Sequence, residues 1–301
     1  MTRVTRRQPV RRLRDGRMSV RSDRLAVEEP LEIRIAGEPF AVTMRTPGHD
    51  IDLINGYCFA EGIIGAATDL STARYCDGVG PDGLNTYNVL ELSLAVGVSP
   101  PPTSVRRNVT TTSACGVCGT TSIDQLMSRV GTPLPAGRSV PSELILDAPE
   151  RLRSEQRVFD ATGGVHAAGL LAADGRLLCV REDVGRHNAV DKVVGWALRE
   201  DLLPLTDVIL VVSGRASFEL VQKAVLAGIG VLVAVSAPSS LAVEVAERSG
   251  LTLVGFVRGG AMNIYTHPDR IVDPATVGAG GDGSDRAGHD GPIVNRGGHA
   301  I

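Results

Sequence analysis

The sequence predicts an α/β protein, α+β overall, in which a smaller strand-rich N-terminal region precedes a parallel βαβαβ portion near the C-terminus. Apolar runs of strand length alternate with helix-compatible runs between residues 207 and 257, and apolar and polar residues alternate over residues 31–44. The composition, 43% hydrophobic and 22% charged, is ordinary for a globular chain. At 301 residues the chain is long enough for one large or two ordinary domains.

Charge and cysteine usage exclude several classes of protein. The net charge of -3 argues against nucleic-acid binding by the chain as a whole. The longest apolar run, residues 224–237, contains glycines and is shorter than the roughly 20 residues of a membrane-spanning helix. The five cysteines are an odd number and no signal peptide opens the sequence, so we expect free thiols in a reducing compartment, the cytoplasm.

Both ends of the sequence are predicted to be disordered. Residues 1–24 carry nine arginines and few apolar residues, which is typical of a solvated arm. The functional interpretation is an arm that touches an anionic partner or cofactor. Residues 271–301 form a glycine-rich tail.

Residues 25–132 form the strand-rich region and end in a cysteine-containing loop and a short helix. Alternating patterns over residues 31–35 and 40–44 predict a hairpin turning at Gly37-Glu-Pro. A helix is expected from His49 or Asp50 to Gly62, and a further strand over residues 85–94.

The loop holds Cys115 and Cys118, three residues apart and flanked by glycine and hydroxyl residues, with a helix-compatible run at residues 122–130. If that run is a helix, both thiols lie in or beside its first turn, where free N–H groups and the helix dipole lower a thiol pKa. The pattern indicates reactive thiols.

Three interpretations of this CxxC pair compete. A structural zinc site needs two more ligands, and Cys58, Cys76 and Cys179 stand alone in the sequence. A thioredoxin-like redox pair is expected between a strand and a long helix, whereas this pair follows a threonine-rich stretch. The third interpretation is a nucleophile that takes up and passes on sulfur. Spacing alone does not choose among them.

Residues 141–270 form the predicted α/β domain, after a linker at residues 133–141. A helix near residues 141–155 precedes two short strands that turn at Asp174-Gly175, with His166 at or near the first strand. A lone histidine of this kind is more often structural than catalytic, although the glycines before it leave room for a ligand.

Residues 181–196 bring many functional groups to the start of a helix. Asp183 or Asn188 is a helix cap in the simplest interpretation. In the functional one, Arg186 and Lys192 bind an anion and His187 transfers a proton.

The βαβαβ portion comprises strands at residues 207–212, 230–235 and 251–257 and helices at 217–227 and 239–249. Each strand ends in a small or polar loop, and ligands of such sheets bind outside the carboxyl ends of the strands. Without a GxGxxG or Walker loop the nucleotide type is open, but Arg215 and Arg258 suit a phosphate-bearing ligand.

Over residues 25–270 the sequence resembles the FdhD/NarQ family of sulfur carrier proteins that activate formate dehydrogenases. The resemblance rests on the order of separate blocks: Thr46-Pro-Gly with Ala60-Glu-Gly-Ile-Ile64, Ser-Ala-Cys115-Gly-Val-Cys118-Gly, Thr162-Gly-Gly-Val-His-Ala-Ala168, Glu182-Asp-Val-Gly-Arg-His-Asn-Ala-Val-Asp-Lys192, Ser213-Gly-Arg215 and Phe256-Val-Arg-Gly-Gly-Ala-Met-Asn-Ile-Tyr265.

The resemblance implies a homodimer with a cytidine-deaminase-like α/β domain. It implies that a cysteine desulfurase supplies sulfur as a persulfide, held on Cys115 with Cys118 assisting, for the molybdenum or tungsten bis-pterin guanine dinucleotide cofactor of formate dehydrogenase. The expected cofactor-binding residues are Ser213, Gly214, Arg215, Phe256, Val257, Arg258, Gly259, Gly260 and Ala261. No permanent metal is expected.

Deamination is a rival activity for such a fold. Zinc deaminases need an HxE motif upstream of PCxxC, but here His166 follows the CxxC, and Ala114 precedes Cys115. Deamination is therefore not expected. Two other functions stay open beside sulfur transfer: a cofactor-binding chaperone with structural or zinc-bound cysteines, and a thiol-disulfide oxidoreductase.

Overall fold

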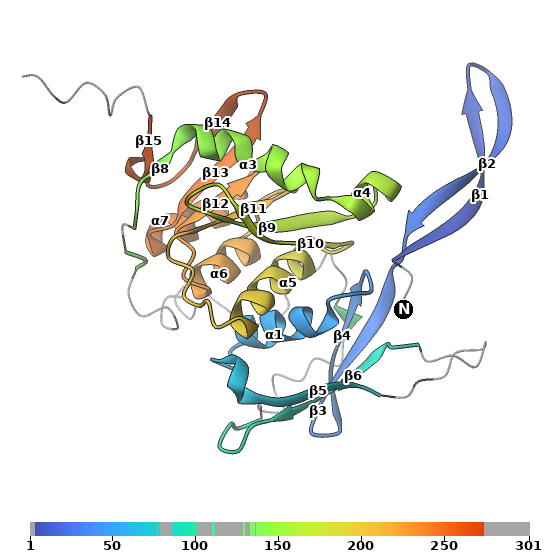
Figure 1. Cartoon of the computed structure of the whole chain (residues 1–301), viewed down its shortest axis with the longest axis horizontal. Coiled ribbons are helices and arrows are strands. Elements are labelled where there is room, and N and C mark those ends of the chain that lie inside the picture. The colour runs from blue at the N-terminus through green and yellow to red at the C-terminus, as the bar shows by residue number, and fades with distance from the viewer. Residues whose placement is uncertain are drawn as a thin grey trace, which may run out of the picture.

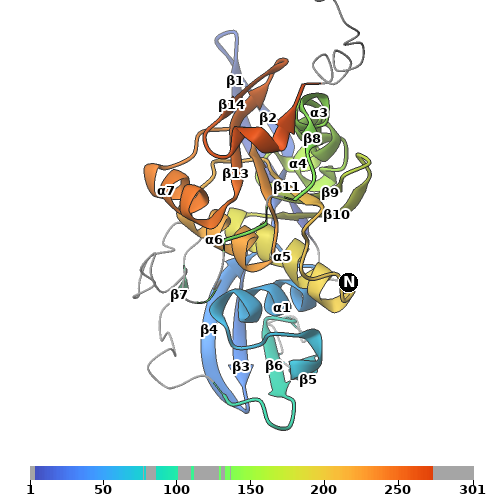
Figure 2. The ribbon, with the colours of Figure 1, turned by 90° about the vertical axis from the view of Figure 1, so that its left-hand side faces the viewer.

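The protein is built as a stack of helical and sheet layers, seen from two directions in Figures 1 and 2. The computed structural model describes residues 4–76, 78, 86–100, 110–111, 129, 133–135 and 137–273. From top to bottom in Figure 1, helix α3, a six-stranded sheet, helices α5 to α7, helix α1 and a second sheet follow one another. The predicted mixed α/β class is confirmed.

The six-stranded sheet has the strand order β10-β9-β11-β12-β13-β14. Its strands are β9 (His166–Ala172), β10 (Leu177–Asp183), β11 (Val208–Val212), β12 (Val231–Ala234), β13 (Thr252–Arg258) and β14 (Ala261–Ile264). The predicted parallel portion is β11-β12-β13, while β9, β10 and β14 add antiparallel strands at the two sides. Continuous apolar runs form the central strands because both faces of the sheet are covered.

Helices cover the two faces of this sheet unequally. They are α3 (Ser142–Ser154), α4 (Arg157–Thr162), α5 (Arg186–Arg199), α6 (Phe218–Leu226) and α7 (Ser240–Ser249). Ile145 and Leu152 of α3 pack on one face, and the apolar sides of α5, α6 and α7 build the larger core on the other. Helix α5 is buried on two sides because it lies between the sheet and α1.

The N-terminal part is a five-stranded sheet with α1 (Asp50–Glu61) packed on it. The strand order is β5-β6-β3-β4-β7, with β3 (Glu29–Ile35), β4 (Glu38–Arg45), β5 (Leu70–Tyr75), β6 (Val89–Leu94) and β7 (Thr110–Thr111). The predicted hairpin is β3-β4. The predicted helix is also confirmed, since it is capped by His49 and Gly62, both in the left-handed conformation.

Helices α1 and α5 cross at unusually close range. A β-carbon at Gly56 would overlap the backbone of Asp191, and one at Gly195 would overlap the backbone of Asp52. The two parts of the chain therefore meet backbone to backbone at a contact that only glycine permits.

A buried ion pair joins the same two parts. Asp183 and Lys192 are 0% and 1% exposed, and their Oδ2 and Nζ atoms are 2.7 Å apart. Lys192 also donates to the carbonyls of Thr46 and Glu182, and Asp183 accepts from the amides of Thr46 and Gly185. Every charge and donor of the pair is thus satisfied, as burial requires.

Residues 5–24 are ordered, which corrects the expectation of a disordered arm. Strands β1 (Thr5–Arg14) and β2 (Arg17–Ala26) form an antiparallel hairpin that projects from the body (Figure 1). Its turn residues, Asp15 and Gly16, both have positive φ angles, the requirement of a tight two-residue hairpin turn. The predicted glycine-rich tail lies, beyond residue 273, outside the described residues.

The remaining elements are short. They are the 3-10 turns Ala67–Asp69 and Pro268–Arg270, and strands β8 (Val140–Pro141) and β15 (Ile271–Val272), which pair in parallel. Among the described residues, no helix is long and apolar enough to cross a membrane.

Replacing Lys192 by methionine tests the buried pair. The variant leaves the Asp183 carboxylate without its counter-charge, so we expect the free energy of unfolding, measured in urea, to fall by about 3–5 kcal/mol. The matched control is Arg176→Met, which removes the cation of the exposed Arg176–Asp174 pair and should cost less than about 1 kcal/mol. Equal losses in the two variants would contradict the assigned role.

Candidate functional site

A cavity of about 730 Å³ opens at the edge of the six-stranded sheet where β11, β12 and β13 end. Its sheet side is formed by Ser213, Val235, Val257 and Arg258, and its opposite wall by α3, α4 and the turn after α4. The volume falls within the range of about 300–1,000 Å³ for small-molecule and cofactor sites. The cavity lies where the topology of a parallel sheet predicts a ligand.

The predicted binding segment 256–261 forms the rim of this cavity. Val257, Arg258 and Gly259 line it. Phe256 has a φ angle of 54°, which breaks the regular register between β13 and β14, and its ring lies 5.9 Å from the guanidinium carbon of Arg258. Gly259 and Gly260 both have positive φ angles in the turn that leads to Ala261, and they have open space around them.

The second predicted segment, residues 213–215, lies beside His166. Ser213 lines the cavity, and its hydroxyl accepts a hydrogen bond from the amide of Ala167. A β-carbon at Gly214 would lie 3.3 Å from Nδ1 of His166, so glycine lets the histidine approach the loop. Arg215 is exposed. The structure brings both predicted segments to one edge, and their role in binding stays a prediction.

His166 carries an altered proton affinity at this edge. Burial, and then the positive charges of Arg186 and His187, lower the pKa of its imidazole below the ordinary value. The ring is therefore neutral near pH 7 and able to accept or donate a hydrogen bond toward the cavity, which it lines.

A polar cluster at the start of α5 and α6 adjoins His166. His187 Nε2 lies 2.9 Å from Glu219 Oε2 and 3.3 Å from the hydroxyl of Ser217. Burial would raise the pKa of Glu219, but the hydrogen bond and charge of His187 lower it below its usual value. Arg186 Nε is buried without a hydrogen-bond partner among the described residues. Two of the three groups predicted for a functional site here, Arg186 and His187, therefore lie at the edge.

Lys192 does not belong to an anion site, which corrects the functional interpretation of that residue. Its ammonium group is buried and its three donors are directed at Thr46, Glu182 and Asp183. Neither Asp183 nor Asn188 caps α5, because the N-cap residue is Gly185 and no side chain caps it. Asp183 has a structural role all the same, since its carboxylate accepts from the amides of Thr46 and Gly185.

Two features of the site do not follow from the sequence analysis. Glu219, the partner of His187, looks there like an ordinary helix residue, although an acid in a first helical turn beside Ser217 is a visible signal. The wall formed by Arg153, Gln156 and Phe159 gives no such signal, because its side chains meet the sheet edge only through tertiary packing.

The predicted catalytic residues Cys115 and Cys118 lie outside the described residues. The nearest described segment before them is β7, which pairs with β4 at Val42 and Thr43. The Thr43 hydroxyl donates to the side-chain oxygen of Asn188 at 3.4 Å, and the Asn188 amide donates to Asp183. Strand β4, the partner of β7, thus contacts the start of α5 through Thr43.

The cysteines that the structure does describe are free thiols, and two of them lie in unreactive settings. Cys58 and Cys179 are buried, and burial raises both pKa values, that of Cys179 to about 12. Among the described residues, no group of three histidine, cysteine or acidic side chains is arranged to hold a metal ion.

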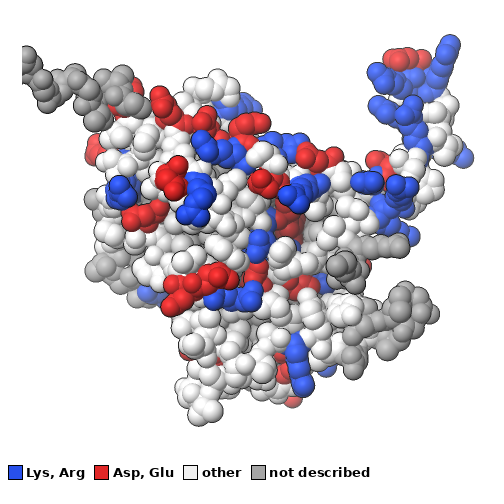
Figure 3. All heavy atoms as spheres, viewed as in Figure 1, with Lys and Arg blue, Asp and Glu red and all other residues white. Residues whose placement is uncertain are grey.

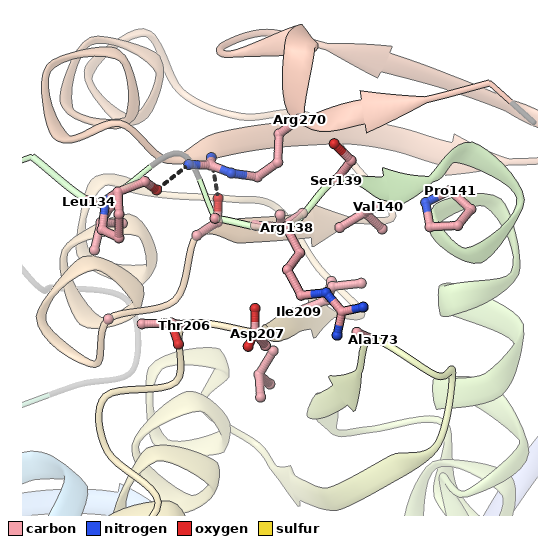
Figure 4. Close-up of a pocket in the computed structure, with 16 residues that line it drawn as sticks. Leu134, Arg138, Ser139, Val140, Pro141, Ala173, Thr206, Asp207, Ile209 and Arg270 are labelled. Atoms are coloured by element: carbon pink, nitrogen blue, oxygen red, sulfur yellow. Dashed lines mark hydrogen bonds between the residues drawn. The ribbon is translucent and has the colours of Figure 1, made fainter. Parts of the chain in front are cut away.

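A second hollow lies at the opposite, amino-terminal edge of the sheet (Figure 4). It holds only about 30 Å³, room for one water molecule. Arg270 donates there to the carbonyls of Gly230 and Pro135, at 2.9 and 2.8 Å. The Arg270 side chain has a structural role in this hollow, and the cavity at the carboxyl edge of the sheet is the candidate ligand site.

The fold is that of a mixed α/β protein with a candidate ligand cavity at the edge of its six-stranded sheet. Comparison with known proteins identifies the family. Residues 26–272 match the FdhD/NarQ family. The chain belongs to that family.

Its relatives include the "Sulfur carrier protein FdhD" of Streptomyces coelicolor, 56% identical over 93% of this chain and all of that one. The protein of the same name from Nocardia farcinica is 57% identical over 89% of this chain and 95% of that one. A putative formate dehydrogenase accessory protein from Desulfotalea psychrophila shares the fold, with a TM-score of 0.69 and 24% identity over 90% of this chain and all of that one.

The low reactivity assigned to the two buried thiols can be tested directly. We expect Cys58 and Cys179 to stay unmodified when the native protein is treated with iodoacetamide at pH 8, because their raised pKa values leave almost no thiolate. Peptide mass spectrometry after alkylation measures this, and the same protein in guanidinium chloride is the control in which both must react. Modification of either residue in the native protein at the rate of free cysteine would refute the assignment.

Proposed function

We propose that the protein is a sulfur carrier that accepts sulfur from a cysteine desulfurase as a persulfide. It transfers this sulfur to the molybdenum or tungsten bis-pterin guanine dinucleotide cofactor of formate dehydrogenase, here a bound substrate. The family and the names of its relatives support sulfur transport. The observation that carries the proposal is the cofactor-sized cavity where β11, β12 and β13 end, which His166 and Arg258 line.

The proposed uptake step is a thiol exchange. The thiolate of Cys115 attacks the outer sulfur of the donor's persulfide, the donor's S–S bond breaks, and the donor cysteine leaves as a thiolate. A new S–S bond forms on Cys115, so no external oxidant or reductant is needed. Cys118 assists, and the high pKa values of Cys58 and Cys179 make those thiols poor substitutes.

Chain length limits how far Cys115 lies from β7. Cys115 lies four residues after Thr111, and four extended residues span at most about 14 Å. Thr111 pairs with Thr43, whose hydroxyl contacts Asn188 at the start of α5. Cys115 is therefore tethered within about 14 Å of the end of β7, whose neighbour β4 contacts α5.

The cavity suits the guanine dinucleotide end of the substrate. Arg258 at the rim supplies a cation for phosphate, and Phe256 lies beside it. Gly259 and Gly260 leave their backbone open to close approach. His166, neutral near pH 7, supplies a hydrogen-bonding group without adding charge. The size of the cavity accommodates one nucleotide, and a homodimer would supply one such cavity for each half of the cofactor.

Sulfur uptake by Cys115 tests the central step. After incubation with a cysteine desulfurase and cysteine, intact-protein mass spectrometry should show added sulfur on the native chain and on Cys76→Ala, but none on Cys115→Ala. The Cys76 variant is the control, because it also removes one incompletely buried thiol. The Cys115 variant should keep its fold and fail to activate formate dehydrogenase.

One outcome would move the sulfur to another thiol, and a second would reject the carrier role. Sulfur uptake by Cys115→Ala at the native level would show that Cys115 is not the residue that carries the sulfur. A loss of uptake in Cys118→Ala would then identify Cys118 as the carrier. No added sulfur on any variant, with zinc bound in its place, would favour the cofactor-binding chaperone.

The nucleotide end is tested with guanosine diphosphate as the probe. We expect Arg258→Gln to weaken its binding at least about ten-fold in calorimetry, because a charged hydrogen bond contributes about 1.5–3 kcal/mol. Arg176→Gln, an exposed arginine in the turn between β9 and β10, is the control and should bind as the native chain does. Unchanged binding by Arg258→Gln would place the nucleotide elsewhere.

A further inference from the structure

The hairpin of β1 and β2 is the part of the structure that the proposed function leaves without a role. It stands away from the layered body as a two-stranded ribbon, and Figure 3 shows it covered with arginine side chains. None of its residues is fully buried. An isolated two-stranded ribbon is marginally stable at best in water, so burial against a partner would stabilise it.

Positive charge is concentrated in the N-terminal segment that contains the hairpin. Residues 1–26 hold nine of the 31 Lys and Arg residues and two of the 34 Asp and Glu residues, which leaves 22 and 32 for the rest. The hairpin segment is thus strongly cationic on a chain that is otherwise anionic. A cationic projection of this kind attracts an acidic surface and speeds its approach.

The hairpin also carries an apolar cluster, which distinguishes a protein partner from a nucleic acid. Leu13, Met18 and Val20 are 65%, 64% and 73% exposed. Leu13 pairs with Met18 and Arg11 with Val20, so strand alternation places all four side chains on one face near the tip. Apolar side chains with Met and Arg are the composition of a protein interface.

The base of the hairpin is fixed at the rim of the cavity. A β-carbon at Gly164, a residue that lines the cavity, would lie 3.6 Å from the β-carbon of Ala26 at the end of β2. One at Gly48 would lie 3.9 Å from Val4. Both strands also contact α4, which forms part of the cavity wall. The hairpin is therefore anchored beside the cavity mouth, and its tip extends about 30 Å from that point toward a bound protein.

We propose that the β1-β2 hairpin is a docking arm for an acidic surface on the enzyme that receives the cofactor from this cavity. The proposal rests on the proposed function, since the client is the protein that must come to the mouth of the cofactor cavity. The docking face is the one that carries Arg7, Arg11 and Arg24 together with Leu13, Met18 and Val20.

The register of the hairpin supplies a matched pair of variants for the test. Arg7→Gln with Arg11→Gln and Arg24→Gln neutralises the docking face, and Arg6→Gln with Arg12→Gln and Arg21→Gln removes equal charge from the opposite face. A third variant, Leu13→Ser with Val20→Ser, keeps all charges. Binding of each full-length variant to the formate dehydrogenase apoenzyme of the same organism is measured by biolayer interferometry at two salt concentrations.

We expect the docking-face and apolar variants to bind the apoenzyme at least about ten-fold more weakly, and the opposite-face variant to lose no more than about two-fold. All variants should take up sulfur from sodium tetrasulfide like the native chain. Failure of the native chain to take up sulfur would count against the proposed function alone.

Any of three results would overturn the proposal of a docking arm. They are no binding of the native chain to the apoenzyme, an equal loss of affinity in the two arginine variants, and native-like binding by all variants. Sedimentation velocity tests whether the hairpin instead contacts a second copy of this chain. A change from dimer to monomer in the hairpin variants, with unchanged binding of the apoenzyme, would show that it does and would also overturn the proposal.

Discussion

The buried pair of Asp183 and Lys192 is the interaction on which the arrangement of the molecule depends. Asp183 ends β10, Lys192 lies in α5 and Thr46 lies in the loop after β4. One charge pair therefore fixes the β10–α5 segment to a loop 137 residues before Asp183. Removing both charges from water is costly, and the pair is stable only because every donor and acceptor is used. The start of α5, and with it His187 and the cavity edge, is positioned by this pair.

That positioning explains how a chain with few aromatic residues builds a defined site. The cavity edge combines strand ends from one sheet with a wall from α3 and α4, and neither half makes a site alone. The strand that leads to the cysteine pair comes from the other sheet, and its neighbour β4 contacts α5 through Thr43 and Asn188. Among the described residues, the α/β part of the chain alone lines the cavity.

Much of the fold is predictable from the sequence because its signals are local. Strands β11 to β13 follow from apolar runs, and α1 from the glycine at its end. The hairpin arm is not predicted because its charge outweighs the Asp15-Gly16 turn signal, and the role of Lys192 is not predicted because the sequence does not reveal its burial. The antiparallel edges and the α3–α4 wall depend on contacts between distant segments, which periodicity does not reveal.

The close crossing of α1 and α5 has a mechanical consequence. Since Gly56 and Gly195 place backbone against backbone, no layer of side chains is present between the helices to rearrange during a sliding motion. The two sheets then behave as one rigid frame during turnover.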